Sequence, residues 1–494
     1  MNVLVPLPVA LPLLAAAASM ALRRRPGAQR FLGVAAMTAT LAAAVAVVDR
    51  VRLGGPTAVQ IGGWSAPFGI TLVADLFAAI MVTLGAAMVL IVLVYAIGHP
   101  RTRDQAPFFH PVYLILAAGV SASFLAGDLF NLFVAFEVML TASYVLLTLE
   151  ASPEQVRGGM TYVVVSLLAS TLFITAVALV YAATGTVNMA DLAGRLALID
   201  PALRAALGLL LLVVFGVKAA IFPLFFWLPD AYPTAVSPIT AVFAGLLTKV
   251  GVYAIIRTQT LLFAPPEAGP STLLLAIAGA TMVIGILGAI VQEDLKRIFS
   301  FNLVSHIGFM VMGLGFFTVA GLAAAIYYIV HHVIVKTSLF LVGGVIEQVA
   351  GTGALHRLGG SLRRSPATAA LFAVPALSLA GLPPFSGFVA KVALVQAGLA
   401  AEQAVIVGVS LAVSLLTLLS MSKIWTGVFW GGPEDIGRDN PLQGSAPRPM
   451  VAATAVLVTV SVVVGFGAGP LYDLSVAAAE QLAPRRYVEA VLVP

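Results

Sequence analysis

Long apolar runs, separated by short polar segments, occupy nearly all of the 494 residues. A helix needs about 20 predominantly apolar residues to cross a bilayer. Runs of this length predict an all-α polytopic membrane protein with about fourteen transmembrane helices, at residues 3–22, 30–48, 70–97, 111–126, 129–149, 158–184, 203–224, 238–262, 271–291, 299–316, 321–346, 367–399, 403–426 and 450–470.

Composition supports this fold class. The chain is 61% hydrophobic and 10% charged, with a mean hydropathy of +1.06, whereas soluble domains are about 25% charged. It has no cysteine, which excludes disulfides, cysteine-ligated iron–sulfur clusters and thiolate zinc sites in this chain. There is no GxxxxGK[ST], HExxH or GxSxG motif, so we expect neither ATP-driven transport nor a cofactor. A haem is disfavoured because no two of the six histidines are expected to pair at one depth, and no metal site is assigned.

The distribution of basic residues predicts an orientation. A net charge of +5 is compatible with nucleic-acid binding, but the basic residues lie in short loops, where they orient a membrane protein. The N-terminal apolar run is followed, not preceded, by its basic cluster at 23–25, so it is read as a first transmembrane helix and not as a signal peptide. With the N-terminus outside, fifteen basic residues face inward: Arg23, Arg24, Arg25, Arg30, Arg101, Arg103, Arg157, Lys296, Arg297, Arg357, Arg363, Arg364, Lys423, Arg438 and Arg448. Seven face outward: Arg50, Arg52, Arg195, Arg204, Arg257, Arg485 and Arg486. This excess predicts that both termini lie outside the cell membrane.

Two of the predicted helices contain clusters of helix-breaking residues. One segment carries Pro223, Pro229, Pro233 and Pro238, and the other carries Gly381, Pro383, Pro384 and Gly387. Irregular backbone at membrane depth is tolerated where it is buried in protein or lines a cavity. A lone break would be read as a packing kink. One break in each half of the chain is typical of internally repeated transporters.

Four lysines lie inside otherwise apolar runs: Lys218, Lys249, Lys336 and Lys391. A charge at bilayer depth costs a few kcal/mol or more, so such residues mark polar paths or pairs. Lys218 precedes the first break by five residues, and Lys391 follows Pro384 by seven. Lys249 lies about 16 Å into its helix, which is too deep for its side chain to reach the interface easily. We predict that the four lysines belong to a proton relay.

Glu137 is the deepest carboxylate of its helix, about 13 Å beyond Asp128. It is interpreted as a counter-charge for Lys218, with a static ion pair between two helices as the alternative. Asp128, at the helix start, is predicted to cap free N–H groups. Asp75, Glu347, His356 and Lys423 lie near helix ends and are predicted to be solvated or interfacial.

A pair of histidines precedes Lys336. His332 lies four residues before it, so both share one helix face. A neutral imidazole accepts a proton at one nitrogen and donates one from the other, which makes His332 a predicted relay member, against the alternative of an ordinary buried histidine. His331 is a further candidate. His306 either extends the relay or bonds to a carbonyl.

These residues resemble a known family. The segment KAAIFPLFFWLPDAYPTAVSPITAVFAGLLTKVGVYAI is similar to the signature of the proton-translocating, antiporter-like membrane subunits. That family spans respiratory complex I, membrane-bound hydrogenases and Mrp-type multisubunit cation/proton antiporters. DLFNLFVAFEVML, EDLKRIFSFNLVSHIGFM, HHVIVKTSLFLVGG and GLPPFSGFVAK extend the match over about residues 70 to 425.

Within this family the chain most resembles the D-type subunits of Mrp antiporters. The grounds are its compact length, the segment HHVIVKTSLFL, and lysine at 391 where some complex I relatives carry glutamate. Many complex I relatives have histidine where this chain has Phe225 and Tyr232, so a proton step on those histidines is not carried over.

The resemblance implies a domain organisation. Residues 1–110 would hold helices 1–3, residues 111–262 the first inverted five-helix repeat, residues 271–426 the second, and residues 427–494 an inner loop, helix 14 and a tail. It also implies the roles of Glu137 and Lys218 as the ion pair of the first repeat, of Lys249 with His332 and Lys336 as the connection, and of Lys391 as the terminal lysine.

The expected function is therefore that of a subunit of a Na⁺(K⁺)/H⁺ antiporter, a secondary transporter and not an enzyme. Its expected partners are other membrane subunits, protons, Na⁺ or K⁺, and the bilayer, with no nucleic acid. The alternative is a proton-pumping subunit of a redox enzyme such as complex I or a membrane-bound hydrogenase. A scaffold with unused lysines is disfavoured by the cost of burying them.

Overall fold

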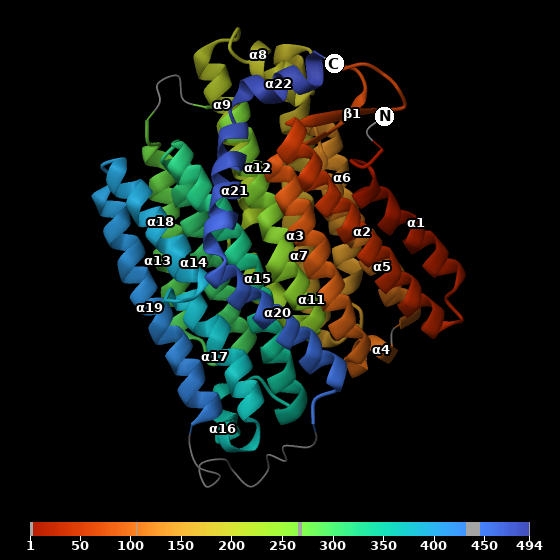
Figure 1. The fold of residues 1–494 in the computed structure, drawn as a ribbon, viewed down its shortest axis with the longest axis vertical. Coiled ribbons are helices and arrows are strands. Elements are labelled where there is room, and N and C mark those ends of the chain that lie inside the picture. The colour runs from red at the N-terminus through yellow and green to blue at the C-terminus, as the bar shows by residue number, and fades with distance from the viewer. Residues whose placement is uncertain (1–2, 105, 265–268, 431–444, 494) are drawn as a thin grey trace.

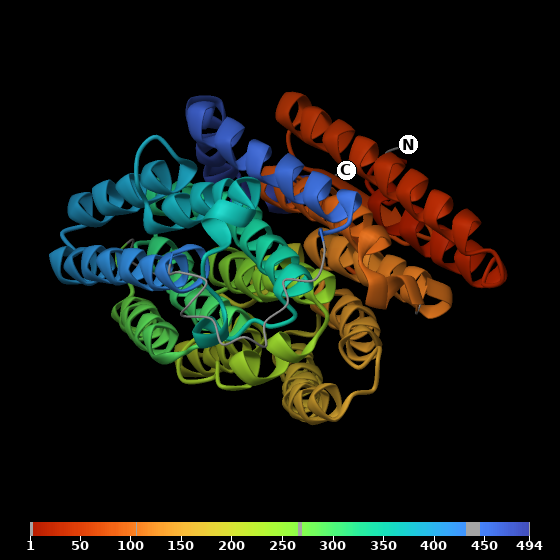
Figure 2. The same ribbon diagram turned by 90° about the horizontal axis from the view of Figure 1, so that it is seen from below.

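A long helix, α15 (Val319–Ala350), runs through the middle of a helical bundle (Figures 1 and 2). The computed structural model describes residues 3–104, 106–264, 269–430 and 445–493. The most apolar stretches of α15 and of the continuous helix Ser237–Leu261 are completely buried. These two elements form the core against which the other helices pack.

The remaining elements surround this core. In chain order they are α1 (Leu7–Ala21), α2 (Pro26–Gly54), β1 (Thr57–Ile61), β2 (Ile70–Ala74), α3 (Leu76–Gly98), α4 (Pro100–Asp104), α5 (Ala106–Leu125), α6 (Leu129–Leu147), α7 (Pro153–Thr184), α8 (Met189–Arg195), α9 (Pro201–Ala219), α10 (Trp227–Ala231), η1 (Tyr232–Thr234), α11 (Ser237–Val242), η2 (Phe243–Leu247), α12 (Thr248–Leu261), α13 (Thr272–Val291), α14 (Leu295–Gly315), η3 (Leu355–Arg357), α16 (Ser361–Arg364), α17 (Pro366–Ala380), α18 (Ser386–Ala400), α19 (Ala404–Phe429), α20 (Arg448–Phe466), α21 (Ala468–Gln481) and α22 (Pro484–Leu492).

The predicted all-α membrane fold is confirmed. Among the described residues, twelve helices are long and apolar enough to cross a membrane, and α1 and the α17–α18 pair are shorter apolar segments. Each predicted span corresponds to one of these fourteen segments. Both ends of the chain lie at the same end of the bundle (Figure 1), as an even number of crossings requires.

Two parts of the chain differ from the prediction. Residues 70–74, placed in the third span, form β2, which pairs with β1 as an antiparallel hairpin. The β-branched residues of ITLVA favour a strand, and α3 starts only after Asp75. The C-terminal tail contains the helices α21 and α22, which an apolar-run criterion does not detect because both carry charged residues.

Both predicted helix breaks are present. Helix α9 ends at Ala219, and Ala220 takes a left-handed conformation with φ 59°. Helix α17 ends at Ala380, and Gly381 is left-handed with φ 91°. A left-handed residue ends a helix by turning the chain. At the second break the carbonyls of Leu379 and Ala380 accept hydrogen bonds from a side chain, and at the first the carbonyl of Val217 accepts one from the Trp227 indole.

Two short backbone bridges recur at opposite ends of the bundle. Near α8, the N–H of Leu129 donates to the carbonyl of Val187 and the N–H of Met189 to that of Gly127. Just before α16, the N–H of Leu295 donates to Gly353 and the N–H of Leu355 to Glu293. Figure 1 places α8 and α16 at opposite ends. Each bridge adjoins the aspartate that caps the next helix, Asp128 for α6 and Asp294 for α14.

Candidate functional site

The four lysines predicted from the sequence all lie inside the bundle. Lys249 and Lys336 are fully buried, and Lys218 and Lys391 are exposed by only 7% and 8%. They come from α9, α12, α15 and α18, so the fold collects them from both halves of the chain. Their surroundings differ, and these differences define what each group can do.

Lys218 sits in the last turn of α9, immediately before the first break. Its Nζ donates a hydrogen bond to the main-chain carbonyl of Ser166 on α7 over 3.2 Å. Glu137 lies near enough to act on Lys218 electrostatically, but its carboxylate accepts a hydrogen bond from the Ser170 hydroxyl. Ser170 is thus the hydrogen-bond partner of Glu137, and the sequence pattern did not indicate it. Glu137 is also only partly buried on the surface of this chain.

A small cavity of about 10 Å³ adjoins Lys218. Tyr162, Tyr232 and Leu247 are among its lining residues, and the buried Tyr232 hydroxyl has no hydrogen-bond partner among the described residues. Its lining is mostly apolar, with Lys218, Ser166 and the tyrosine hydroxyls as the polar groups, and its volume is close to the smallest that holds one water molecule. The cavity therefore extends the surroundings of Lys218 toward η2 and the start of α12.

Lys249 is held by an irregular turn of its own helix. The turn η2 is π-helical, a form that occurs mostly as single bulges at functional sites. The Lys249 Nζ donates to the carbonyl of Ala244 in this turn, over 2.6 Å. Lys336 lies within electrostatic range of Lys249. The π-turn thus supplies an acceptor to a lysine that has no carboxylate nearby in sequence.

Lys336 has the least satisfied environment of the four. Its Nζ has no hydrogen-bond partner among the described residues. It lies 5.7 Å from the centre of the Phe299 ring, a distance at which a ring face attracts a cation. The neighbouring Thr337 hydroxyl is also unpaired in this part of the structure. Buried polar groups normally find a protein or water partner, so Lys336 differs from Lys218, Lys249 and Lys391, whose ammonium groups each donate to a main-chain carbonyl.

His306 and His332 face each other, with 5.3 Å between their ring centres. The expectation that no two histidines would pair at one depth was wrong, because α14 and α15 are antiparallel neighbours and bring distant residues level. The Nδ1 of His306 hydrogen-bonds to the Tyr328 hydroxyl over 2.6 Å. The hydrogen-bond partner of His306 is therefore a phenol and not the carbonyl that the sequence analysis considered. Both nitrogens of His332 are unpaired among the described residues.

His331 connects the central helix to the second break. Its Nδ1 lies 2.8 Å from the Ser386 hydroxyl, and Ser386 lies 3.3 Å from the Ser378 hydroxyl on α17. The sequence pattern did not single out either serine, because serine is common in membrane helices and only the fold shows which ones meet.

Lys391 bridges the two halves of the second broken helix. Its Nζ donates to the carbonyls of Leu379 and Ala380, over 3.1 and 2.8 Å, at the buried C-terminal end of α17. The left-handed Gly381 leaves room for it, since a Cβ there would lie 2.7 Å from the lysine Cδ. Lys391 also lies 5.4 Å from the centre of the Phe309 ring and acts electrostatically on His306 and His331.

Of the residues predicted to be solvated or interfacial, some lie at the surface and others inside the bundle or at a cavity. His356 is exposed, as expected. Asp75 is not interfacial: it is fully buried and paired with Arg257, which belongs to α12 and not to an outer loop. Removing Arg257 from the outer basic residues strengthens the predicted charge asymmetry. Glu347 lines a cavity, where it contacts Lys296. Arg438 lies outside the described residues.

Among the described residues, no cluster of three or more histidine, aspartate or glutamate side chains could hold a metal ion. The site is instead a row of basic groups in which Lys249, Lys336, His332, His306 and Lys391 influence one another electrostatically. Such a row has the chemistry to accept and release protons in turn.

Comparisons with known proteins agree with this arrangement. Residues 126–417 match the family described as NADH:quinone oxidoreductase/Mrp antiporter, transmembrane region. The chain is 43% identical to the D-type subunit of the Na⁺/H⁺ antiporter of Alkalihalophilus pseudofirmus and 36% identical to that of Bacillus subtilis, in each case over the full length of both proteins. Its fold matches a chain of the Mrp complex from Dietzia sp. DQ12-45-1b with a TM-score of 0.92 and 35% identity, covering both chains completely.

The fold and the buried row of basic groups define a multi-pass, antiporter-like membrane subunit. The chain belongs to the NADH:quinone oxidoreductase/Mrp antiporter family.

Proposed function

We propose that this chain is a subunit of a multisubunit Na⁺(K⁺)/H⁺ antiporter and carries protons across the membrane. The observation that carries the proposal is the row of buried lysines and histidines between two broken helices. The names of the full-length relatives and the likeness to the Mrp complex support the antiporter over the redox-enzyme alternative. The protein is then a secondary transporter subunit and not an enzyme.

The proposed relay runs from Glu137 and Lys218 through Lys249, then His332 and Lys336, to Lys391. Lys218 and Lys391 lie at the two breaks, where the Lys218 ammonium group donates to the Ser166 carbonyl on α7 and the Lys391 ammonium group donates to carbonyls at the end of α17. His306 and His331 are the proposed side members, since each acts electrostatically with Lys391. The cavity beside Lys218 supports water-mediated transfer toward Lys249.

Coupling in this relay is electrostatic. A proton loaded on one buried lysine disfavours charge on the next, because like charges repel strongly in a poorly solvated interior. Loading Lys249 therefore favours release from Lys336, and a charged Lys336 or Lys391 favours neutral histidines between them. In this scheme the inward flow of protons drives the export of the cation.

The proposal includes partners. The assembly would contain several other membrane subunits, as the likeness to a chain of the Mrp complex supports. Glu137 is partly exposed at membrane depth on the isolated chain. Because a carboxylate that faces lipid would be costly, a neighbouring subunit is proposed to cover it.

We also propose that the protein lies in the plasma membrane with both termini outside. The excess of basic residues at the opposite end of the bundle supports this orientation. The chain has no cysteine, so single cysteines at 363 and 485 test it directly with an impermeant thiol reagent on intact cells. Labelling at 363 and not at 485 would reverse the orientation.

Residues 111–262 and 271–426 are proposed to be inverted repeats. The recurrence of the same capped backbone bridge at opposite ends of the bundle supports this division. Each proposed repeat also contains one broken helix and at least one buried lysine.

The test of the proposed function is Lys218→Ala in the whole complex, assayed for cation/proton antiport in everted membrane vesicles. Removing a group that transfers protons lowers a rate by about 100-fold or more, so antiport should be lost while the subunits still co-purify. Arg204→Ala is the matched control, because Arg204 lies on the same helix and also donates to main-chain carbonyls. Normal antiport in the Lys218 variant would refute the relay.

A further inference from the structure

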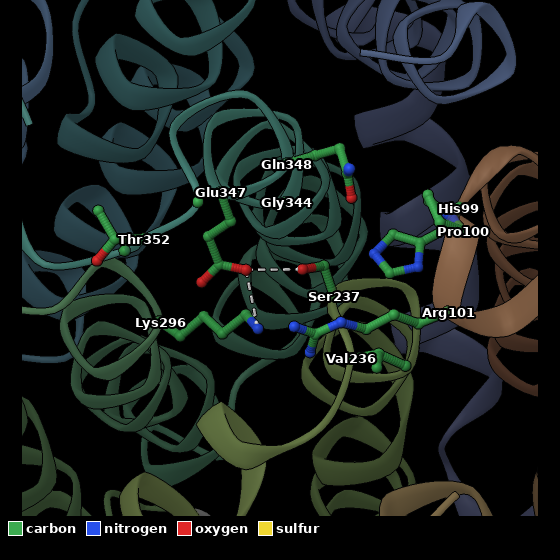
Figure 3. Close-up of a pocket in the computed structure, with 12 residues that line it drawn as sticks. His99, Pro100, Arg101, Val236, Ser237, Lys296, Gly344, Glu347, Gln348 and Thr352 are labelled. Carbon is green, nitrogen blue, oxygen red and sulfur yellow. Dashed lines mark hydrogen bonds and ion pairs between the residues drawn. The ribbon is translucent and has the colours of Figure 1, made fainter. Parts of the chain in front are cut away.

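A cavity of about 400 Å³ opens at the end of the bundle opposite the two termini. It lies where α3 ends, α4 and α11 begin, α14 begins and α15 ends. Figure 3 shows His99, Arg101, Ser237, Lys296 and Glu347 around it. The proposed relay includes none of these residues.

An ion pair forms one wall of this cavity. The Lys296 Nζ lies 2.9 Å from Glu347 Oε2, and the Ser237 hydroxyl donates to the same oxygen over 2.9 Å. Lys296 also donates to the carbonyl of Ala235. The side chains are exposed by 13% and 21%, so the pair touches the cavity while three elements hold its geometry.

Other ionisable groups face Glu347 from the surrounding elements. Tyr95 on α3 acts electrostatically with it, and Asp294, which caps α14, lies across Gly353, where a Cβ would come within 2.9 Å of both carboxylates. Burial, together with Lys296 and Arg101, lowers the pKa of His99 to about 4, so this imidazole is neutral at physiological pH. Among the residues that line the cavity, Glu347 is the carboxylate.

Helix geometry connects Glu347 to the relay. Glu347 follows Lys336 by eleven residues on α15, which is about three turns and about 16 Å along one face. The continuous helix α11–η2–α12 packs along that face at two glycines. A Cβ on Gly344 would overlap the Ser237 Cβ and the Tyr95 hydroxyl. A Cβ on Gly245 would contact the Thr337 hydroxyl.

This seam between α11–α12 and α15 contains polar groups without partners. The hydroxyls of Thr248 and Thr337 and the Nζ of Lys336 are buried and unpaired among the described residues. Such groups normally bind protein atoms or ordered water. Polar groups thus lie at both ends of this seam, with Ser237 at the cavity and Lys249 and Lys336 at the centre.

We propose that Glu347 is the group through which the relay exchanges protons with this cavity, and that Lys296 and Ser237 position its carboxylate. This inference rests on the proposed function. A proton from water in the cavity binds the carboxylate, which loosens its pairing with Lys296. It then passes along the seam to Lys336, the carboxylate is regenerated, and the pair with Lys296 forms again.

The test is Glu347→Gln in the complete complex, with antiport measured in vesicles against the pH on the cavity side. We expect a fall of about 100-fold and a flattened pH profile, with Glu347→Asp keeping part of the rate. Glu293→Gln is the matched control, because Glu293 lies at the same end and approaches Lys423 at 4.0 Å outside the cavity. A wild-type rate and pH profile in Glu347→Gln would overturn the proposal.

Lys218→Ala, assayed in parallel, separates this proposal from the proposed function. If only the Lys218 variant is inactive, the relay stands and the role of Glu347 falls. If both variants are active, the relay itself falls.

A labelling experiment tests the proposal even if the Glu347→Gln complex does not assemble. Thr352→Cys places a thiol on the cavity wall, and Arg363→Cys places one on the exposed helix α16 at the same end. A bulky impermeant thiol reagent should block antiport in the Thr352→Cys variant only. The complex that carries neither introduced cysteine is a further control. Equal, small effects in both would overturn the proposal.

Discussion

Arg257 on α12 and Asp75 at the start of α3 form a buried ion pair, with 2.5 Å between Arg257 Nη1 and Asp75 Oδ2. A second guanidinium nitrogen lies 2.8 Å from Oδ1. The Tyr253 hydroxyl accepts a hydrogen bond from Arg257, and the ring of Tyr487 on α22 lies 5.2 Å from the guanidinium carbon. The ion pair thus joins α3 to α12, and the Tyr487 ring adds the C-terminal helix α22 to the same cluster.

Removing one member of this pair should destabilise the protein strongly. Arg257→Met leaves Asp75 charged and buried, a change that costs about 3–5 kcal/mol, whereas Asp75→Asn with Arg257→Met should cost less because no charge remains unpaired. Thermal unfolding of the purified complex measures both. A double variant at least as unstable as Arg257→Met would contradict the prediction.

Lys391 and Lys423 allow a direct comparison of structural and functional roles. Each ammonium group donates to two main-chain carbonyls at the end of a helix, Lys391 at α17 and Lys423 at α13. Replacing either by alanine should lower stability by a similar amount, about 1–3 kcal/mol.

Only Lys391→Ala should abolish antiport, because Lys423 lies at the bundle end, partly exposed. Antiport in vesicles and thermal unfolding of the same preparations check this pair of expectations. Comparable loss of antiport in the two variants would show that the effect of Lys391 is structural.

Asp128 should make stability depend on pH. Burial, partly offset by backbone N–H groups, raises its pKa to about 6 from an ordinary value of 3.8. A carboxyl group whose pKa is higher in the folded state binds more protons there, so stability falls as pH rises from about 4 to about 6. The full effect is roughly 3 kcal/mol.

Asp128→Asn keeps a capping oxygen for the N–H of Asn131 and removes the charge. Its melting temperature should therefore exceed that of the unmodified protein at pH 7, and the difference should vanish near pH 4. A difference that does not change with pH would rule out this role of Asp128.

Much of the architecture could be predicted because it depends on local sequence. A run of about 20 apolar residues specifies a span, and proline or glycine clusters around Pro223 and Pro384 specify where a span is interrupted. Lys218 and Lys391 could be recognised as unusual from their immediate neighbours alone. The strand at 70–74 was missed because its apolar residues continue directly into α3. A single apolar run therefore contains both a strand and a helix.

The partners of the candidate groups could not be predicted in the same way. Ser170, Tyr328 and Ser386 carry no unusual sequence context, yet they are the hydrogen-bond partners of Glu137, His306 and His331. The π-turn η2 that receives Lys249 also has no signal in FAGLL.

The sequence by itself determined the number of spans, the positions of their breaks and the presence of buried basic groups, because hydrophobic length, proline and charge act locally. Only the tertiary structure decided that Arg257 meets Asp75, that His306 faces His332, and that Glu347 and Lys296 line one cavity. These contacts join residues far apart in the chain, and helix packing alone sets the depth and the rotation that bring them together.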